Sequence, residues 1–144
     1  MKRSRLSLPL VLASLLAASA LACGDSRRAL ENRQWSDNFA FRITVDPMPP
    51  RAIEDANYKI VVQDKKTGEP IETGQGRIFA NSKDGARTDD GLAKGKEVGT
   101  YYGRLFFPTT GDWAIALQFR RDSTSKLERV DWVQTVNNAS GPGG

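Results

Sequence analysis

Histidine is absent from this chain of 144 residues, and cysteine occurs once, at Cys23. Without histidine, the usual serine–histidine pair of a hydrolase cannot be assembled. A single cysteine excludes an intramolecular disulfide, so a small exported domain would depend on its apolar core alone. Methionine is also scarce, because Met48 is the only one after Met1. The soft ligands that copper(I) prefers are therefore nearly missing, and we expect no bound metal and no cofactor.

The basic excess of the chain, a formal net charge of +4, belongs to its first residues. Lys2, Arg3 and Arg5 all precede Asp25, the first acidic residue. Removing these three from the 21 basic residues leaves 18 against 17 acidic residues, a net charge of +1. A nearly neutral surface gives no electrostatic reason to expect a nucleic-acid partner.

Residues 1–23 have the three zones of a bacterial export signal. Met1–Arg5 is positively charged, Leu6–Leu21 is apolar, and Ala20–Leu21–Ala22 is a cleavage site of the small-x-small type directly before Cys23. The segment resembles the lipobox of bacterial lipoproteins, which implies that the chain is cut before Cys23 and that the thiol carries a lipid. The sequence departs from the commonest lipobox at Ala20, where that motif has leucine.

Two alternatives stay open for this segment. An uncleaved membrane span needs about 20 apolar residues, whereas this run has roughly 16 and contains Pro9. Simple cleavage at the same bond would leave Cys23 with a free thiol. Lipidation would instead give a stable anchor, since two or three acyl chains hold a protein where one chain is marginal. Gly24 is not the aspartate that resembles an inner-membrane retention signal, so we expect a lipid anchor in the outer membrane, facing the periplasm.

We predict four parts of the chain: a signal peptide at 1–22, a flexible tether at 23–38, a β-sandwich domain at 39–136 and a disordered tail at 137–144. The tether and the tail are polar and lack a sustained period. Trp35, within the tether, is interpreted either as a binding aromatic or as a side chain that folds back on the domain.

Alternation of apolar and polar residues dominates the domain and predicts strands. They are expected at 39–45, 58–62, 71–80, 99–108, 113–120 and 128–136. Trp113 opens the clearest alternating run, so we predict that it lies at the centre of the core. Short strands, polar turns and the lack of a long helical period indicate an all-β, immunoglobulin-like antiparallel β-sandwich. Tyr102, Phe106 and the edge of Trp132 could form an exposed apolar face, although core packing is the ordinary role of such residues.

The stretch 81–98 is glycine-rich and charged, and we predict a long loop there. Its carboxylates, Asp84, Asp89 and Asp90, could in principle hold calcium. Ala86 breaks the alternation of oxygen ligands that such a site needs, so we interpret the segment as a solvated loop.

Several short motifs resemble the YtkA-like and FixH-like family of small membrane-tethered immunoglobulin-type domains. The resemblance covers about residues 39–122 and rests on a strand that ends at Pro47, on Thr67–Ile71, on Gly99–Gly103 and on Gly111–Ile115. It implies an association with respiratory-oxidase assembly or copper handling. Family members associated with copper carry methionine and histidine in the long loop before the strand that corresponds to Gly99–Gly103. The matching stretch here, 79–98, has neither, so the copper chemistry does not carry over.

Two classes of function follow from the sequence. The first is a non-catalytic interaction or assembly module that displays an edge or face of the sandwich to an envelope protein. The second is a metal or small-ligand carrier, as the family resemblance suggests. An enzyme is a third and weaker hypothesis, because no catalytic constellation is recognisable.

Overall fold

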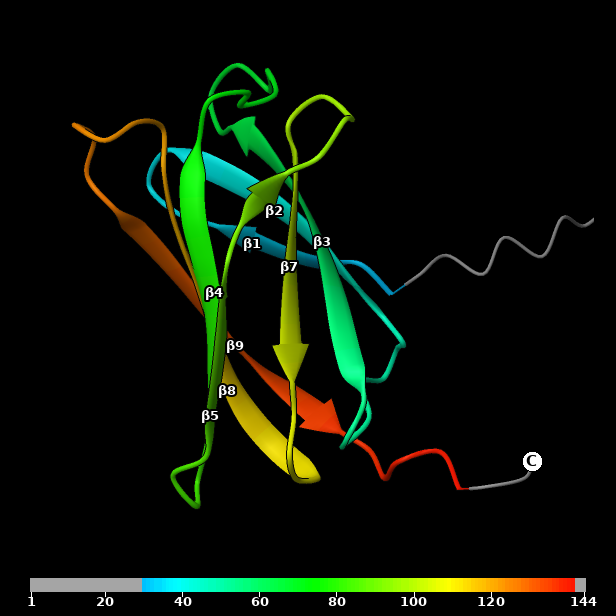
Figure 1. The fold of residues 1–144 in the computed structure, drawn as a ribbon. Coiled ribbons are helices and arrows are strands. Elements are labelled where there is room, and N and C mark those ends of the chain that lie inside the picture. Colours follow the sequence, from blue (N-terminus) through cyan, green and yellow to red (C-terminus); the bar gives the residue numbers. More distant parts are fainter. Residues whose placement is uncertain (1–29, 142–144) are drawn as a thin grey trace, which may run out of the picture.

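The computed structural model describes residues 30–141, which form two antiparallel sheets packed face to face (Figure 1). One sheet has five strands in the order β1-β2-β3-β7-β6, and the other has four in the order β5-β4-β8-β9. The strands are β1 Asn32–Trp35, β2 Phe39–Asp46, β3 Asp55–Asp64, β4 Gln75–Ser82, β5 Arg87–Gly91, β6 Ala93–Lys94, β7 Thr100–Phe106, β8 Gly111–Arg120 and β9 Glu128–Val136. Between residues 30 and 141 there is no helix, and so none long and apolar enough to cross a membrane. The prediction of an all-β sandwich is confirmed.

The core lies between the sheets and is built from alternate residues of the strands. Along β2, Phe39, Phe41 and Ile43 point inward and are almost completely buried. Trp113 on β8 is fully buried, as predicted, and packs edge-on against Phe107 with ring centroids 5.1 Å apart. Its indole N–H donates to the Thr109 carbonyl at 3.1 Å. The period-two pattern therefore placed the large apolar side chains on the correct face.

Part of the predicted tether is a strand. β1 pairs with β2, with Asn32 opposite Ile43 and Trp35 opposite Ala40. The prediction of a flexible tether over 23–38 is therefore wrong at 32–35. No apolar alternation marks this strand, because its inward side chains, Asn32 and Gln34, are polar and bond each other at 2.8 Å. Backbone pairing at the sheet edge decides its conformation, and Trp35 points outward, with 58% of its surface exposed.

The predicted loop at 81–98 also contains strands. β5 pairs with β4 from Arg87 opposite Asn81 to Gly91 opposite Arg77, and the short β6 pairs with β7. Two side chains of β5 accept hydrogen bonds from backbone N–H groups at the edge of β7. Asp90 accepts the Arg104 N–H at 2.8 Å, and Thr88 accepts the Phe106 N–H at 3.1 Å. Polar residues make this strand because its inward side chains bond to backbone instead of entering the core.

The predicted disordered tail, 137–144, is ordered at its beginning. The Asn137 N–H donates to the Pro50 carbonyl, and the Ala52 N–H donates to the Asn137 carbonyl, both at 2.8 Å. The Ser140 N–H donates to the Glu54 carboxylate at 2.9 Å. These bonds tie 137–140 to the β2–β3 loop, so the prediction is wrong for these residues. Residues 142–144 lie outside the described part of the chain.

Two buried tyrosines differ in the state of their hydroxyl groups. The Tyr101 hydroxyl donates to the Ile71 carbonyl at 2.7 Å and accepts the Gly74 N–H at 2.9 Å. The Tyr58 hydroxyl is buried without a hydrogen-bond partner, and burial raises the pKa of this phenol. The alternation of inward and outward residues buries both rings, but only the Tyr101 hydroxyl hydrogen-bonds to the backbone.

This difference predicts opposite effects of removing each hydroxyl. Tyr101→Phe should lower the free energy of unfolding by about 1–3 kcal/mol, because it leaves buried backbone groups unpaired. Tyr58→Phe should leave that free energy unchanged or raise it, because the desolvated hydroxyl disappears. Urea denaturation of both variants measures this, and a loss of stability in Tyr58→Phe as large as in Tyr101→Phe would contradict the assignment.

Candidate functional site

The one site residue predicted from sequence, Cys23, lies outside the described residues, as does the signal peptide at 1–22. The carboxylates considered for calcium do not converge. Asp89 pairs with Arg77 at 3.3 Å, and Asp90 caps the edge of β7 through the Arg104 N–H. Within residues 30–141, no three His, Cys, Asp or Glu side chains gather in a way that could hold a metal ion.

Where the pKa of a carboxyl group is shifted in the described part of the chain, it is lowered. Hydrogen bonds from Thr124 and Ser125 lower the pKa of Asp122 to about 2. The backbone N–H groups of Thr67 and Lys66 lower the pKa of Asp64, and Lys94 lowers that of Glu72. A general acid at neutral pH needs a shift in the other direction. These carboxylates instead organise turns and exposed ion pairs.

The exposed aromatic residues do not form the single face that the sequence suggested. Tyr102 and Phe106 are exposed on the outward side of β7, in the five-stranded sheet. Trp132 alternates with exposed neighbours on β9 and packs against the core from the four-stranded sheet. The prediction of a shared face is therefore wrong for Trp132, because the alternation of β9 turns its indole inward.

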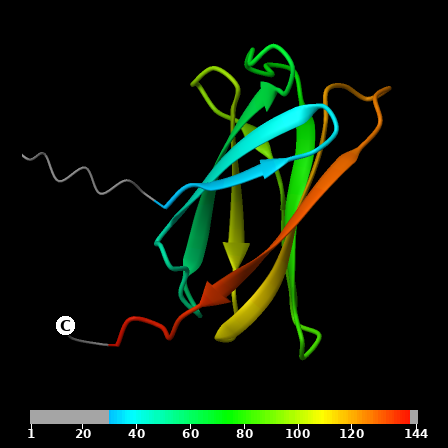
Figure 2. The ribbon, with the colours of Figure 1, turned by 180° about the vertical axis from the view of Figure 1, so that it is seen from behind.

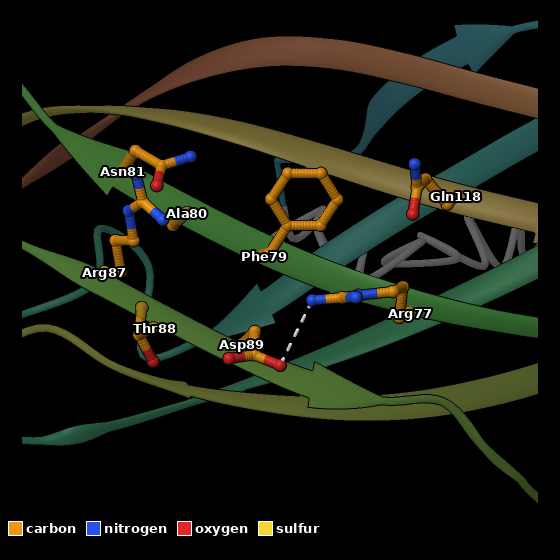
Figure 3. Close-up of a pocket in the computed structure, with 8 residues that line it drawn as sticks. All are labelled: Arg77, Phe79, Ala80, Asn81, Arg87, Thr88, Asp89 and Gln118. Carbon is orange, nitrogen blue, oxygen red and sulfur yellow. Dashed lines mark hydrogen bonds and ion pairs between the residues drawn. The ribbon is translucent and has the colours of Figure 1, made fainter.

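The outward side of the four-stranded sheet is hollowed. A shallow depression of about 500 Å³ lies over β4 and β5 (Figure 3). It is lined by Arg77, Phe79, Ala80, Asn81, Arg87, Thr88, Asp89 and Gln118. The Phe79 ring stands between Asn81 and Gln118, while Arg77 reaches towards Asp89 on the neighbouring strand (Figure 3).

Phe79 is the centre of a row of side chains that also contains Arg77, Asp89, Arg129 and Asp131, which we call the Phe79 row. The guanidinium carbons of Arg77 and Arg129 each lie 5.1 Å from its ring centroid. Both arginines are held by carboxylates, Arg77 by Asp89 at 3.3 Å and Arg129 by Asp131 at 2.7 Å. The pairing with Asp131 raises the pKa of Arg129. The arrangement presents an aromatic ring flanked by two guanidinium groups, which suits recognition rather than bond-making chemistry.

Sequence reasoning missed this row. Its members are spread over β4, β5 and β9, and only the antiparallel register places Phe79 opposite both Asp89 and Ala116. A signal was nevertheless present, because Phe79 interrupts the alternation of β4 as a large apolar residue on the polar side. Ala116, its small neighbour on β8, leaves room for Arg129 to reach across.

No family model matches the chain, and no curated protein matches it. Among solved structures, a DUF4426 family protein from Pseudomonas aeruginosa PAO1 is similar, with a TM-score of 0.58 and 8% sequence identity over 79% of this chain and 99% of that chain. The fold is an immunoglobulin-like β-sandwich. The Lin-41 filamin domain gives a TM-score of 0.48 and 11% identity over 70% of this chain and 93% of that chain, a likeness too low to support an argument. At these identities the comparisons show the fold alone.

The motifs that carry the YtkA-like and FixH-like resemblance have structural roles in this fold. Gly99 has a φ of 63°, and a Cβ atom there would come within 2.7 Å of Pro70. Tyr101 fixes the Ile71–Gly74 segment through its hydroxyl. Gly99–Gly103 and Thr67–Ile71 therefore shape one packed corner of this sandwich.

Proposed function

We propose that this protein is a membrane-anchored envelope lipoprotein whose sandwich is a non-catalytic binding or assembly-accessory module. The observation that carries the proposal is the position of Cys23, directly after a small-x-small cleavage site at the end of an export signal. The folded strands begin only nine residues later, at Asn32, so a lipid on Cys23 would hold the sandwich close to a membrane. The copper-carrier alternative has no supporting feature among the described residues.

The Phe79 row is the surface that supports a binding role best. Aromatic and arginine side chains are enriched where proteins meet, since they offer large rigid contact areas and several hydrogen-bond donors. Arg77 and Arg129 are half-exposed, so their guanidinium groups are accessible to a partner's carboxylates. An envelope protein is the partner that fits a lipid-anchored domain facing the periplasm.

Two variants separate anchoring from binding. Cys23→Ser should move the protein from the membrane fraction to the soluble fraction and abolish incorporation of labelled palmitate, because no thiol is left to acylate. We expect the wild-type protein to crosslink to an envelope protein in intact cells. Phe79→Ala should remain acylated and in the membrane but should lose this crosslink. Fractionation and crosslinking of the same cultures measure both.

Equal membrane association of wild type and Cys23→Ser would remove the basis for a lipid anchor. An unchanged crosslinking pattern in Phe79→Ala would move the binding surface elsewhere on the sandwich. Phe106→Ala is a suitable control, since Phe106 is an exposed aromatic residue on β7 in the other sheet.

A further inference from the structure

Three exposed apolar side chains belong to segments on the side of the domain where the chain enters the sandwich. Leu30 precedes β1 and is 73% exposed, and Met48 and Ile53, in the β2–β3 loop, are 42% and 68% exposed. Asn32 lies opposite Ile43, so Leu30 comes beside the end of β2, where this loop begins. Figures 1 and 2 show, from opposite sides, that the entering chain, the β2–β3 loop and the C-terminal segment lie on the same side of the domain. We call Leu30, Met48 and Ile53 the apolar trio.

The backbone of Ile53 is strained in a way that keeps its side chain in the solvent. Its φ is 62°, in the left-handed region that β-branched residues rarely adopt. The Ile53 N–H donates to the Phe107 carbonyl at 2.8 Å, and the adjacent Ala52 N–H donates to Asn137. These bonds fix the loop, so the fold holds an exposed isoleucine in an unfavourable conformation without gaining core packing from it. Strain of this kind points to a role for the side chain outside the folding of the domain.

The distance to the lipid anchor limits what can cover the trio. Cys23 and Leu30 are seven positions apart, and seven residues span at most about 25 Å even when fully extended. Leu30, the first described residue of the trio, is therefore held within this distance of a lipid on Cys23. Charge near it is balanced, since Arg51 lies 3.9 Å from Glu54, so any contact would be apolar rather than electrostatic.

We infer that the apolar trio inserts into the headgroup region and upper acyl layer of the phospholipid bilayer that holds the Cys23 lipid. This inference rests on the proposed lipid anchor and adds an orientation to it. Apolar side chains gain free energy on entering this layer, and this gain does not depend on the salt concentration. The end of the sandwich that carries the β8–β9 turn then points away from the membrane, and the Phe79 row faces sideways into the periplasm.

The experiment uses the full lipidated protein and a fluorescent label. Because Cys23 is the only cysteine and is consumed by the lipid, Ile53→Cys provides a single reactive thiol for a nitrobenzoxadiazole probe. Leu127→Cys is the control, since Leu127 is 45% exposed in the β8–β9 turn at the opposite end. In phosphatidylethanolamine and phosphatidylglycerol vesicles with brominated acyl chains, the probe at 53 should shift to the blue and lose intensity, with no dependence on salt. The probe at 127 should do neither.

A second variant guards against misfolding of the labelled protein. Ile53→Asn tolerates the left-handed backbone, so it should fold and stay anchored, yet it should reduce lipid quenching of a probe on Met48→Cys. Equal quenching at 53 and 127, or no effect of Ile53→Asn, would overturn the inference. Shielding of residue 53 in native membranes but not in protein-free vesicles would also overturn it, because a protein would then cover the trio. Failure of the lipid anchor itself would appear separately, as release of the wild-type protein from membranes.

Discussion

Trp113→Ala is expected to leave most of the protein unfolded or poorly recovered. The indole is fully buried, contacts Phe107 edge-on and donates its N–H to the Thr109 carbonyl. Removing a buried tryptophan costs about 3–5 kcal/mol, because its contacts vanish and a cavity remains. A single domain has only about 5–15 kcal/mol of stability in total. No disulfide can compensate, since the chain has one cysteine.

Urea denaturation followed by circular dichroism measures this effect. Arg120→Ala is the matched control on the same strand, because the Arg120 guanidinium makes only exposed hydrogen bonds, to Gln75 and Ser123. We expect it to cost less than about 1 kcal/mol. A midpoint for Trp113→Ala close to that of the wild type would mean that β8 faces the other way and that the packing of the sandwich is different.

Glu128→Ala is the second variant with a large expected effect. Glu128 is 6% exposed, and its carboxylate accepts the Asn38 backbone N–H at 3.0 Å, the Asn38 side-chain amide at 2.5 Å and the Ser36 hydroxyl. These bonds join the β1–β2 turn of one sheet to the start of β9 in the other. Hydrogen bonds to a charged group contribute about 1.5–3 kcal/mol, so the variant should lose roughly 3 kcal/mol.

The pH dependence of this contribution follows from the sign of the pKa shift. Burial alone would raise the pKa of Glu128, but the hydrogen bonds from Ser36 and Asn38 outweigh burial and lower it from its usual 4.5. The stabilisation is therefore complete above the pKa of the unfolded chain and is lost as the pH falls through the lower pKa of the folded protein. Glu128→Gln keeps the shape and removes the titration.

The stability difference between wild type and Glu128→Gln should accordingly shrink over the acid range below about pH 4.5. Comparing the two proteins matters, because lowered pKa values at Asp64, Glu72 and Asp122 also make both of them less stable in acid. A difference that stays constant over this range would show that the Glu128 charge does not contribute to the link between the sheets.

Sequence periodicity alone predicted the strands whose alternation is carried by apolar side chains. In β2 and β8, Phe41 and Trp113 lie on the buried face, as the period-two pattern predicts, because a shift of one residue would expose every large side chain of the strand. The all-β class followed from several such strands. The proposed export signal and the proposed lipid on Cys23 rest on the sequence alone, because these residues lie outside the described part of the chain.

The strands and contacts that do not depend on apolar burial follow from tertiary interactions. β1 and β5 are polar and were predicted as tether and loop; they become strands because β2 and β4 offer them backbone partners. Tyr58 and Tyr101 have the same sequence pattern, yet only the latter finds partners for its hydroxyl, because these come from a segment about 30 residues away. The left-handed backbone of Ile53 leaves no mark in the sequence, since bonds from Ala52 and Ile53 to distant carbonyl groups impose it. Short-range periodicity reports which side of a strand is buried, whereas edge pairing, hydrogen-bond partners and strain depend on residues that the fold brings together from far apart in the chain.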